Sequence, residues 1–444
     1  MPDIMIPAGS VEPASPQSLS PQSLSPMPDG SGPDRGKDRR VVWKFGGTSV
    51  GDGARLRAVA ARLVAARREG LQVVAVLSAM AGSTDDLLRL ALDLSPAPRP
   101  RELDALLSVG ESMSCALAAI AVHELGERAV SLTGWQAGVH TDGAHGNAGV
   151  RRVTPERVVE ALRENAIVLV TGFQGVSANG DITTLGRGGS DASAIALASA
   201  MGLSECDIFT DVPGVLTADP RVVPTARKLE WVSHDEMLQL SDAGAGVLQT
   251  RAVELAAAHG IDIHVRSSFT FEPGTWVRRD TPRPEETRVC GVAHIVHDPL
   301  YTVTGVSPAV VSAALAQRAV AIGSMVGDDG AVWFTAPGTA PGQLVAALAA
   351  VDAAVAVRDD VGSVSVVGAT AATRSEIIAT ALSALERIDV GVQLVTRTPN
   401  RVSCHVLSSH VEFAARALHA AFWLHEPAMA ADGVATTMAT AMHV

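Results

Sequence analysis

Residues 41–50 read VVWKFGGTSV, an apolar run that ends in a lysine, a phenylalanine and two glycines. The β-branched and aromatic residues favour a strand, and the glycines allow a tight turn before a helix at Ala54–Glu69 that Gly70 ends. Backbone N–H groups approach an anion closely at such a turn, and Lys44 adds a mobile positive charge suited to a phosphoryl group. The stretch predicts phosphate binding, although an ordinary Gly-Gly turn is the alternative. It is not a P-loop, because the lysine precedes the glycines.

The pattern around this turn favours an α/β domain. Apolar strand-like runs alternate with helical patterns as far as about residue 285. Strands are expected at 71–78, 166–173 and 205–212, and helices in a long stretch ending near Leu125, at Ser190–Met201 and after the capping box Ser233/Glu236. Near-continuous apolar strands separated by helices are typical of a mostly parallel sheet covered by helices on both faces. We assign this catalytic domain to residues 40–290.

The second half of the chain contains an internal repeat. The order strand, helix, strand, strand, helix is expected at 300–306, 308–318, 319–326, 331–335 and 341–350, with a further strand near 353–358, and again at 362–367, 373–387, 389–396, 401–407 and 409–421. A repeat of about 60 residues with this order predicts two ferredoxin-like βαββαβ modules. We assign them to residues 296–360 and 361–425, followed by a tail at 426–444.

Composition excludes several classes of protein. The formal net charge of −12 argues against a nucleic-acid partner, because phosphate backbones need a basic face. The four cysteines are scattered without a metal-site spacing, which favours a reducing cytoplasm. No uninterrupted apolar run of membrane-spanning length and no signal core is expected. Residues 1–39 contain PQSLS twice and are expected to form a disordered leader, and a start at Met27 stays open.

Two further glycine-rich stretches carry candidate ligand-binding residues. In TTLGRGGSDASA (183–194), Ser190 is the expected helix cap, Arg187 offers a fork that matches a carboxylate, and Asp191 suits a substrate ammonium group. The alternative for Asp191 is a carboxylate that only complements the helix dipole. In FTDVPGVLTADPR (209–221), a strand runs into polar residues, which is where open α/β sheets bind ligands. The alternative for this stretch is a plain surface loop.

Several weaker signals lie between these stretches. Ser78 and Thr84 occur in LSAMAGSTDDL and Glu111 in VGESMS, and each has a structural alternative: a strand end, a helix cap or a solvated helix charge. His140 and His145, in the segment 133–146, lack a metal-ligand spacing and are expected to be structural. No metal site built from protein ligands is expected.

Taken together and in this order, these motifs resemble the aspartate kinase family of the amino acid kinase fold. The motifs are KFGGTSV, the TG-QAG segment, GFQGVS, TTLGRGGSD and TDVPG–TADPR, and the resemblance covers residues 40–285 closely and extends more loosely to about 425. It implies phosphoryl transfer from ATP, with Mg²⁺, to the side-chain carboxylate of L-aspartate, opening the route to lysine, threonine and methionine. The C-terminal modules resemble paired ACT modules, which implies a homodimer.

The resemblance also assigns roles to residues. Lys44 and Asp191 are implied to be catalytic, and Ser78, Thr84, Glu111, Arg187 and Asp191 are implied to surround aspartate. Lys44, Gly46, Gly47, Thr210, Asp211 and Arg221 are implied on the nucleotide side. These residue types fit the implied reaction, because a carboxylate nucleophile is already ionised at pH 7 and needs no general base.

The sequence departs from the family at the nucleotide side. Where the family reads GAKVLHPR this chain reads GAGVLQTR, so that Gly246 replaces a lysine expected near the phosphates and Gln249-Thr250 replaces His-Pro. The family's tyrosine before TADPR is Leu216. Arg221, Arg227 and Lys228 are candidates to compensate. A catalytically inactive regulatory paralogue and a kinase for a related amino acid are therefore alternatives.

The C-terminal modules depart as well. The Pro-Gly turn that usually precedes the first helix of each ACT module is eroded in VSPAVVSAAL (306–315) and GATAATRSEII (368–378). Without those glycines a backbone cradle for an amino-acid effector is weakened. We expect feedback inhibition by lysine or threonine to be weakened or absent.

Overall fold

The computed structural model describes residues 40–279 and 289–422, except 319, 321, 329, 337–338, 340, 350, 352 and 369–373. The expected leader at 1–39 and the tail at 426–444 lie outside these residues.

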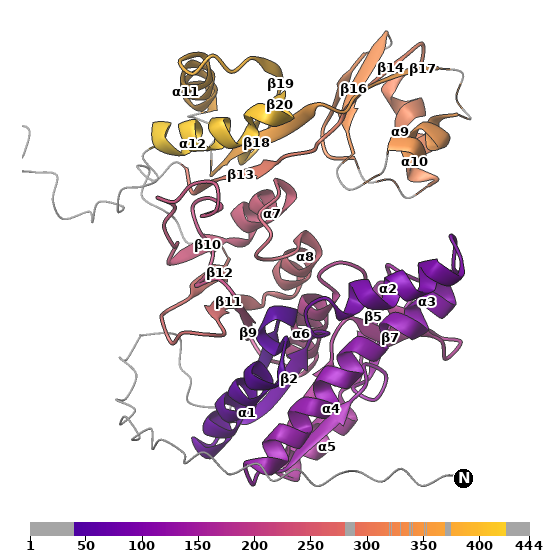
Figure 1. Cartoon of the computed structure of the whole chain (residues 1–444), viewed down its shortest axis with the longest axis vertical. Coiled ribbons are helices and arrows are strands. Elements are labelled where there is room, and N and C mark those ends of the chain that lie inside the picture. The colour runs from indigo at the N-terminus through magenta and orange to yellow at the C-terminus, as the bar shows by residue number, and fades with distance from the viewer. Residues whose placement is uncertain are drawn as a thin grey trace, which may run out of the picture. The chain divides into compact units, whose positions relative to one another are not determined.

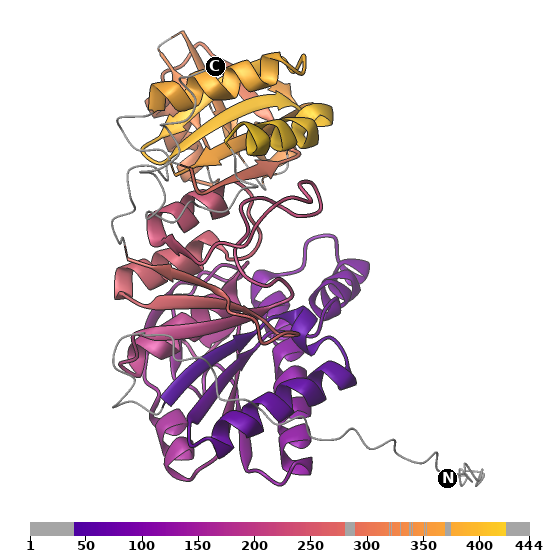
Figure 2. The same cartoon turned by 90° about the vertical axis from the view of Figure 1, so that its left-hand side faces the viewer.

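An eight-stranded sheet forms the centre of the N-terminal half, in the order β10-β12-β11-β9-β1-β2-β6-β3 (Figures 1 and 2). Its strands are β1 (Arg40–Phe45), β2 (Gln72–Leu77), β3 (Ala129–Leu132), β6 (Ile167–Thr171), β9 (Glu205–Thr210), β10 (Trp231–Ser233), β11 (Asp262–Ser267) and β12 (Thr275–Arg278). Every neighbouring pair is parallel except β11–β12. This confirms the predicted mostly parallel α/β fold.

Helices cover both faces of this sheet. They are α1 (Gly53–Arg68), α4 (Val109–Glu124), α5 (Glu156–Arg163), α6 (Gly189–Ala200), α7 (His234–Asp242) and α8 (Thr250–His259). Two further helices, α2 (Ser83–Leu94) and α3 (Pro100–Leu107), pack against each other, and α3 also packs against α4 and the strand β8 (Ile182–Thr184). In β1, Val42 packs in the cluster that includes α6 and α8, whereas Trp43 and Phe45 pack in the cluster that includes α1 and α4. Since strand side chains alternate between faces, Lys44 points to the α6 face.

The capping box predicted from Ser233 and Glu236 is confirmed at the start of α7. The predicted cap Ser190 is wrong by two residues, because α6 begins at Gly189 and its N-cap is Gly188. Gly188 has a φ of 69°, a conformation that glycine adopts without strain.

The long helical stretch predicted before Leu125 is divided into α2, α3 and α4. The segment Pro100–Glu124, which contains α3 and α4, is long and apolar enough to cross a membrane by length and composition alone, a test that buried core helices also pass, and 44% of its most apolar window is buried. The inner side of α4 contributes Cys115, Ala118 and Val122 to the core shared with α1.

A second sheet extends the domain on the side of α3. It has the order β5-β4-β7-β8, with β4 (Val139–Thr141), β5 (Val150–Val153), β7 (Gln174–Val176) and β8 (Ile182–Thr184). The segment 133–146, which holds the TG-QAG motif and the two histidines expected to be structural, thus contains a strand.

The first C-terminal module has the ferredoxin-like order. Its elements are β14 (Leu300–Thr304), α9 (Pro308–Ala316), β15 (Met325–Gly327), β16 (Ala331–Thr335), α10 (Pro341–Leu348) and β17 (Ala354–Arg358), and the sheet order is β15-β16-β14-β17. The strand predicted at 319–326 is short, because only Met325–Gly327 pairs with β16.

The second module borrows a strand. Its own elements are β18 (Val361–Val367), α11 (Arg374–Glu386), β19 (Val392–Thr398), β20 (Arg401–Leu407), the short helix η2 (Ser408–His410) and α12 (Val411–Ala421), and α11 and α12 lie side by side (Figure 1). The fourth strand of its sheet, in the order β13-β18-β20-β19, is β13 (Gly291–Ile295). The first module is therefore inserted between the two parts of the second.

Candidate active site

The ends of four parallel strands form one edge of the large sheet. Phe45 of β1 is in register with Leu77 of β2 and Phe209 of β9, and Leu77 is in register with Thr171 of β6. Ligands of open α/β sheets bind beyond the carboxyl ends of such strands. This edge is where most of the candidate residues lie.

An ion pair between Lys44 and Asp191 lies at this edge. Lys44 Nζ is 2.6 Å from Asp191 Oδ1, and the two residues are only 9% and 6% exposed. Asp191 lies in the first turn of α6, so the helix N-terminus also favours its negative charge. The two residues predicted to be catalytic are thus brought together, with the lysine held in one place by the carboxylate.

The glycine turn follows directly. The Gly46 N–H donates to the Phe209 carbonyl over 3.1 Å, so it is occupied, contrary to the expectation that Gly46 offers a backbone donor to phosphate. Gly47 begins the short helix η1 (Gly47–Val50), and a Cβ there would lie 2.7 Å from the Ala79 carbonyl oxygen. Gly47 is thus required for the close approach of two loops.

Glu111 is buried beside the same loop. It lies in the first turn of α4, is 3% exposed, and its Oε1 accepts a hydrogen bond from the Ala79 N–H over 3.0 Å. Oε2 has no hydrogen-bond partner among the described residues. Burial raises the Glu111 pKa to about 7, partly opposed by the Ala79 hydrogen bond.

The other residues expected around aspartate are more accessible. Ser78 follows β2 and is half-buried, with its N–H donating to the Phe45 carbonyl over 3.1 Å. Thr84 is half-buried in the first turn of α2 rather than at its cap, which is Gly82. Arg187 is exposed in the loop before α6.

The expected nucleotide side is only partly assembled. Thr210 ends β9, and its hydroxyl lies 3.2 Å from the carboxylate of the exposed Asp211. Arg221 instead pairs with Asp219 at 2.6 Å, and this raises the Arg221 pKa. Val222, next in the chain, packs in the core of the second C-terminal module.

The segment 244–251, where the sequence departs from the family, lies beside the loop that precedes α6. Gly246 is exposed and a Cβ there would meet no atom within 4 Å. Gln249 packs against Gly188, where a Cβ would lie 2.3 Å from the Gln249 Cβ. Of the candidates to compensate, Lys228 donates to the Pro273 carbonyl, which engages its ammonium group.

Two residues of the GFQGVS motif (172–177) lie beside the site, although the sequence indicated no individual role for either. A Cβ on Gly172 would lie 2.7 Å from the Ser190 side chain, so glycine lets α6 approach the end of β6. Phe173 has a φ of 69° and its N–H donates to the Ser193 hydroxyl over 3.2 Å. A positive φ at a bulky residue beside a binding site is a form of local strain that sequence patterns do not reveal.

Family comparisons agree with this architecture. The amino acid kinase family matches residues 39–267, and the ACT domain matches residues 364–422. The first match covers every strand of the large sheet except β12, and the second covers most of the second C-terminal module.

Individual proteins are similar over nearly their whole length. The aspartokinase of Mycolicibacterium smegmatis is 43% identical over 405 residues, covering 86% of this chain and 96% of that protein. The aspartokinase of Geobacillus stearothermophilus is 40% identical, covering 88% and 98%. The crystal structure of E. coli aspartokinase III in complex with aspartate and ADP is similar in fold, with a TM-score of 0.77, 24% identity, and coverage of 86% and 99%.

Proposed function

The chain belongs to the aspartokinase family, and on that premise we propose how its residues transfer the γ-phosphoryl group of ATP to the side-chain carboxylate of L-aspartate. The observation that carries this proposal is the buried Lys44–Asp191 pair at the strand ends. A positive charge fixed there stabilises charge on a transferring phosphoryl group without reorganisation during the reaction.

Aspartate is proposed to bind between the loop after β2 and the N-termini of α4 and α6. The free Oε2 of Glu111 is a buried acceptor that suits the substrate ammonium group. Arg187 is exposed, which leaves its guanidinium available for a bidentate pair with a substrate carboxylate. Ser78 and Thr84 are proposed to supply hydroxyl groups to the aspartate pocket. Asp191, which is paired with Lys44, is proposed to border the same pocket.

ATP is proposed to bind on the opposite side of Lys44. Gly47 offers a backbone N–H to the phosphates. The Gly46 N–H is already bonded to the Phe209 carbonyl, so the proposed role of Gly46 is to let the phosphates come close to the backbone. Thr210 and Asp211 follow β9, and Arg221 belongs to this set only if it exchanges Asp219 for phosphate.

Mg²⁺ is compatible with this site. It takes one or two carboxylates and otherwise phosphate and water oxygens, so it needs no cluster of protein ligands. Within the described residues no group of three or more His, Cys, Asp and Glu residues converges, whereas the exposed Asp211 offers a single carboxylate. When bound with ATP, the ion neutralises phosphate charge.

The proposed step needs no base from the protein. A side-chain oxygen of aspartate attacks the γ-phosphorus as the bond from that phosphorus to the bridging oxygen of ADP breaks. The products are 4-phospho-L-aspartate and ADP, and no proton moves because the carboxylate is ionised at neutral pH. The chain's task is to hold two anions in line and to offset their repulsion.

A substrate panel tests this assignment. ADP release should require aspartate and stay at background with glutamate, N-acetylglutamate or UMP under equal conditions. Faster release with one of these than with aspartate would assign the site to another substrate.

The pH dependence should report Glu111. Because burial raises its pKa to about 7, the group is largely protonated below that pH and cannot pair with the substrate ammonium group. We expect kcat/KM for aspartate to rise as the pH increases through about 7 and then to level off. Steady-state kinetics between pH 5.5 and 9 measures this.

Glu111→Gln is the matched variant for that profile. It should lower kcat/KM for aspartate and flatten the rise, while the melting temperature at pH 8 should increase because a buried charge is removed. An unchanged pH profile in this variant would assign the titration to another group.

Replacing Gly246 by lysine should raise activity. The position is exposed and sterically open, so a lysine fits without a clash. It restores the lysine that the resemblance to the family implies near the phosphates. We expect about a tenfold gain in kcat/KM for ATP, in line with single charge-assisted contacts to phosphate. Gly246→Gln is the control for side-chain length without charge, and an equal gain in both variants would contradict an electrostatic role.

The biological setting is proposed on the same basis. We propose that the product enters lysine, threonine and methionine biosynthesis, that the ACT modules form a homodimer, and that feedback by lysine or threonine is weak. A cytoplasmic location agrees with four buried cysteines that are scattered along the chain. Strong inhibition of the purified protein by either amino acid would refute the regulatory part.

A further inference from the structure

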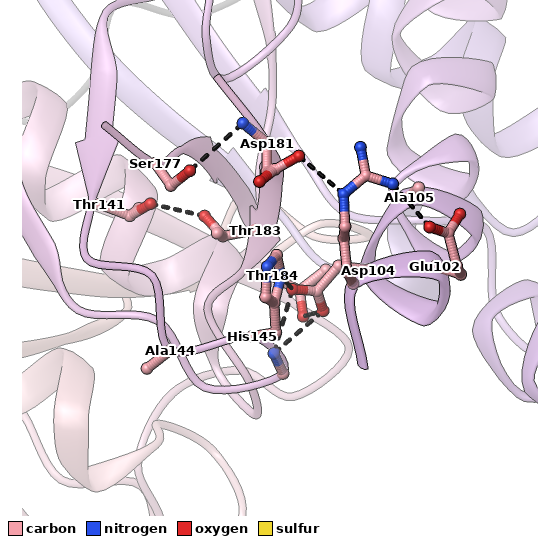
Figure 3. A network of polar contacts seen from close by, with 12 residues as sticks. Glu102, Asp104, Ala105, Thr141, Ala144, His145, Ser177, Asp181, Thr183 and Thr184 are labelled. Atoms are coloured by element: carbon pink, nitrogen blue, oxygen red, sulfur yellow. Dashed lines mark hydrogen bonds and ion pairs between the residues drawn. The ribbon is translucent and has the colours of Figure 1, made fainter. Parts of the chain in front are cut away.

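A buried carboxylate outside the set of proposed ligands connects three segments of the domain. Asp104 in α3 is 1% exposed and lies at the centre of the network in Figure 3. Its Oδ1 accepts from the Thr184 hydroxyl over 2.5 Å, and its Oδ2 lies 2.7 Å from His145 Nδ1. The Gly146 N–H donates to both oxygens, at 3.0 and 3.1 Å. Both oxygens are therefore fully engaged.

Other contacts surround this network, but none of those described here joins α3 to β8 through a buried carboxylate. Thr141 and Thr183 share a hydrogen bond of 2.6 Å between β4 and β8, and Arg101 pairs with Asp181 at 2.7 Å at the other end of β8 (Figure 3). Arg101 and Asp181 are more exposed than Asp104, so their pairing is screened by solvent. Asp104 is thus the buried link between α3 and β8.

Each of the two elements that Asp104 joins leads to a proposed aspartate ligand. The short helix α3 runs through Ser108 into α4, whose first turn carries Glu111. The Ser108 carbonyl accepts from Gln174 Nε2 over 2.8 Å, which ties this junction to β7.

On the other side, Thr184 ends β8 three residues before Arg187. The Thr184 carbonyl accepts from the Ala148 N–H over 2.8 Å, and the Leu185 carbonyl accepts from Arg251 over 2.6 Å. The start of the loop that carries Arg187 is therefore fixed by hydrogen bonds, although the Arg187 side chain itself is exposed.

We propose that Asp104 is a positioning residue that fixes the spacing between Glu111 and Arg187, and thereby the width of the aspartate pocket. This inference rests on the proposed roles of those two ligands. Asp104 acts through its hydrogen bonds to Thr184, His145 and Gly146, and it touches neither substrate. Loss of the link lets the α3–α4 junction and the β8 loop move independently, which affects aspartate more than ATP.

Asp104→Asn in the full-length protein tests this. The amide nitrogen cannot accept from the Gly146 N–H or the Thr184 hydroxyl, and it bonds His145 only when Nδ1 carries no proton. The charge-assisted contacts of the carboxylate are therefore lost or replaced by weaker neutral ones. We expect the Kd for aspartate, measured by calorimetry without ATP, to rise about tenfold, as for one or two lost buried hydrogen bonds. KM for aspartate should rise in parallel, whereas KM for ATP should stay within about twofold.

Two variants keep the test decisive. Thr184→Val removes only the hydroxyl donor and should weaken aspartate binding in the same direction if Asp104→Asn does not fold. Asp142→Asn is the control, because Asp142 also accepts backbone N–H groups of the loop 142–149, at 2.9 and 3.2 Å, but has no bond to α3 or β8 among the described contacts.

The outcomes separate this inference from the proposed function. Unchanged aspartate affinity in Asp104→Asn or Thr184→Val, or an equal loss in Asp142→Asn, would overturn the positioning role. Equal increases in KM for both substrates would indicate general destabilisation and would also overturn it. Calorimetry needs no turnover, so an inactive wild-type protein that binds aspartate would count against the proposed kinase reaction alone.

Discussion

Lys44→Met should reduce kcat by about 10²- to 10³-fold, the usual cost of removing one group that stabilises developing charge. The ammonium group is the cation held at the strand ends, 2.6 Å from Asp191 and next to the glycine turn. KM for aspartate should change much less than kcat, because the proposed contacts of Lys44 are with the transferring phosphoryl group. Steady-state measurement of ADP release checks both values.

Stability must be separated from catalysis in that experiment. Lys44→Met leaves the carboxylate of Asp191 buried without its partner, which costs about 3 to 5 kcal/mol. Adding Asp191→Asn removes the unpaired charge, so the double variant should recover most of the melting temperature and none of the activity. Activity that returns with stability would show that Lys44 serves folding only.

Arg187→Ala should raise KM for aspartate by about 100-fold, because a bidentate pair of charge-assisted hydrogen bonds is lost. Arg187 is exposed, so its removal should leave the melting temperature unchanged. Kinetics at varied aspartate concentration, beside thermal unfolding, measures the two effects.

Arg187→Lys is the matched variant. It keeps the charge but loses the fork, and it should retain only part of the affinity for aspartate. A KM for aspartate within about twofold of wild type in Arg187→Ala would exclude this residue from the pocket.

Much of the catalytic fold could be predicted because its signals are local. In VVWKFGGTSV the residue types that favour a strand adjoin the glycines of a turn, and both β1 and η1 form there. The capping box of α7 is likewise complete within four residues. The pairing of Lys44 with Asp191 follows from the fold, because alternation along β1 turns the lysine toward α6.

Features that depend on distant partners could not be predicted. The short run at Gly291–Ile295 gives no indication that it completes a sheet with β18, more than 60 residues later in the chain. The occupied N–H of Gly46 depends on Phe209. The pairing of Arg221 with Asp219 is local, two residues apart, but the sequence does not decide between this carboxylate and a phosphate as the partner of Arg221. Asp104 gave no signal, because a single carboxylate in a helix is ordinarily solvated.

The measurement that tests the central claim most directly is the formation of aspartyl hydroxamate by the full-length protein with ATP, Mg²⁺ and hydroxylamine. We predict hydroxamate that depends on aspartate, equals the ADP released, and falls to background in the folded Lys44→Met/Asp191→Asn variant. Equal hydroxamate formation by that variant, or ADP release by the wild type without hydroxamate, would contradict phosphoryl transfer to the aspartate carboxylate at this site.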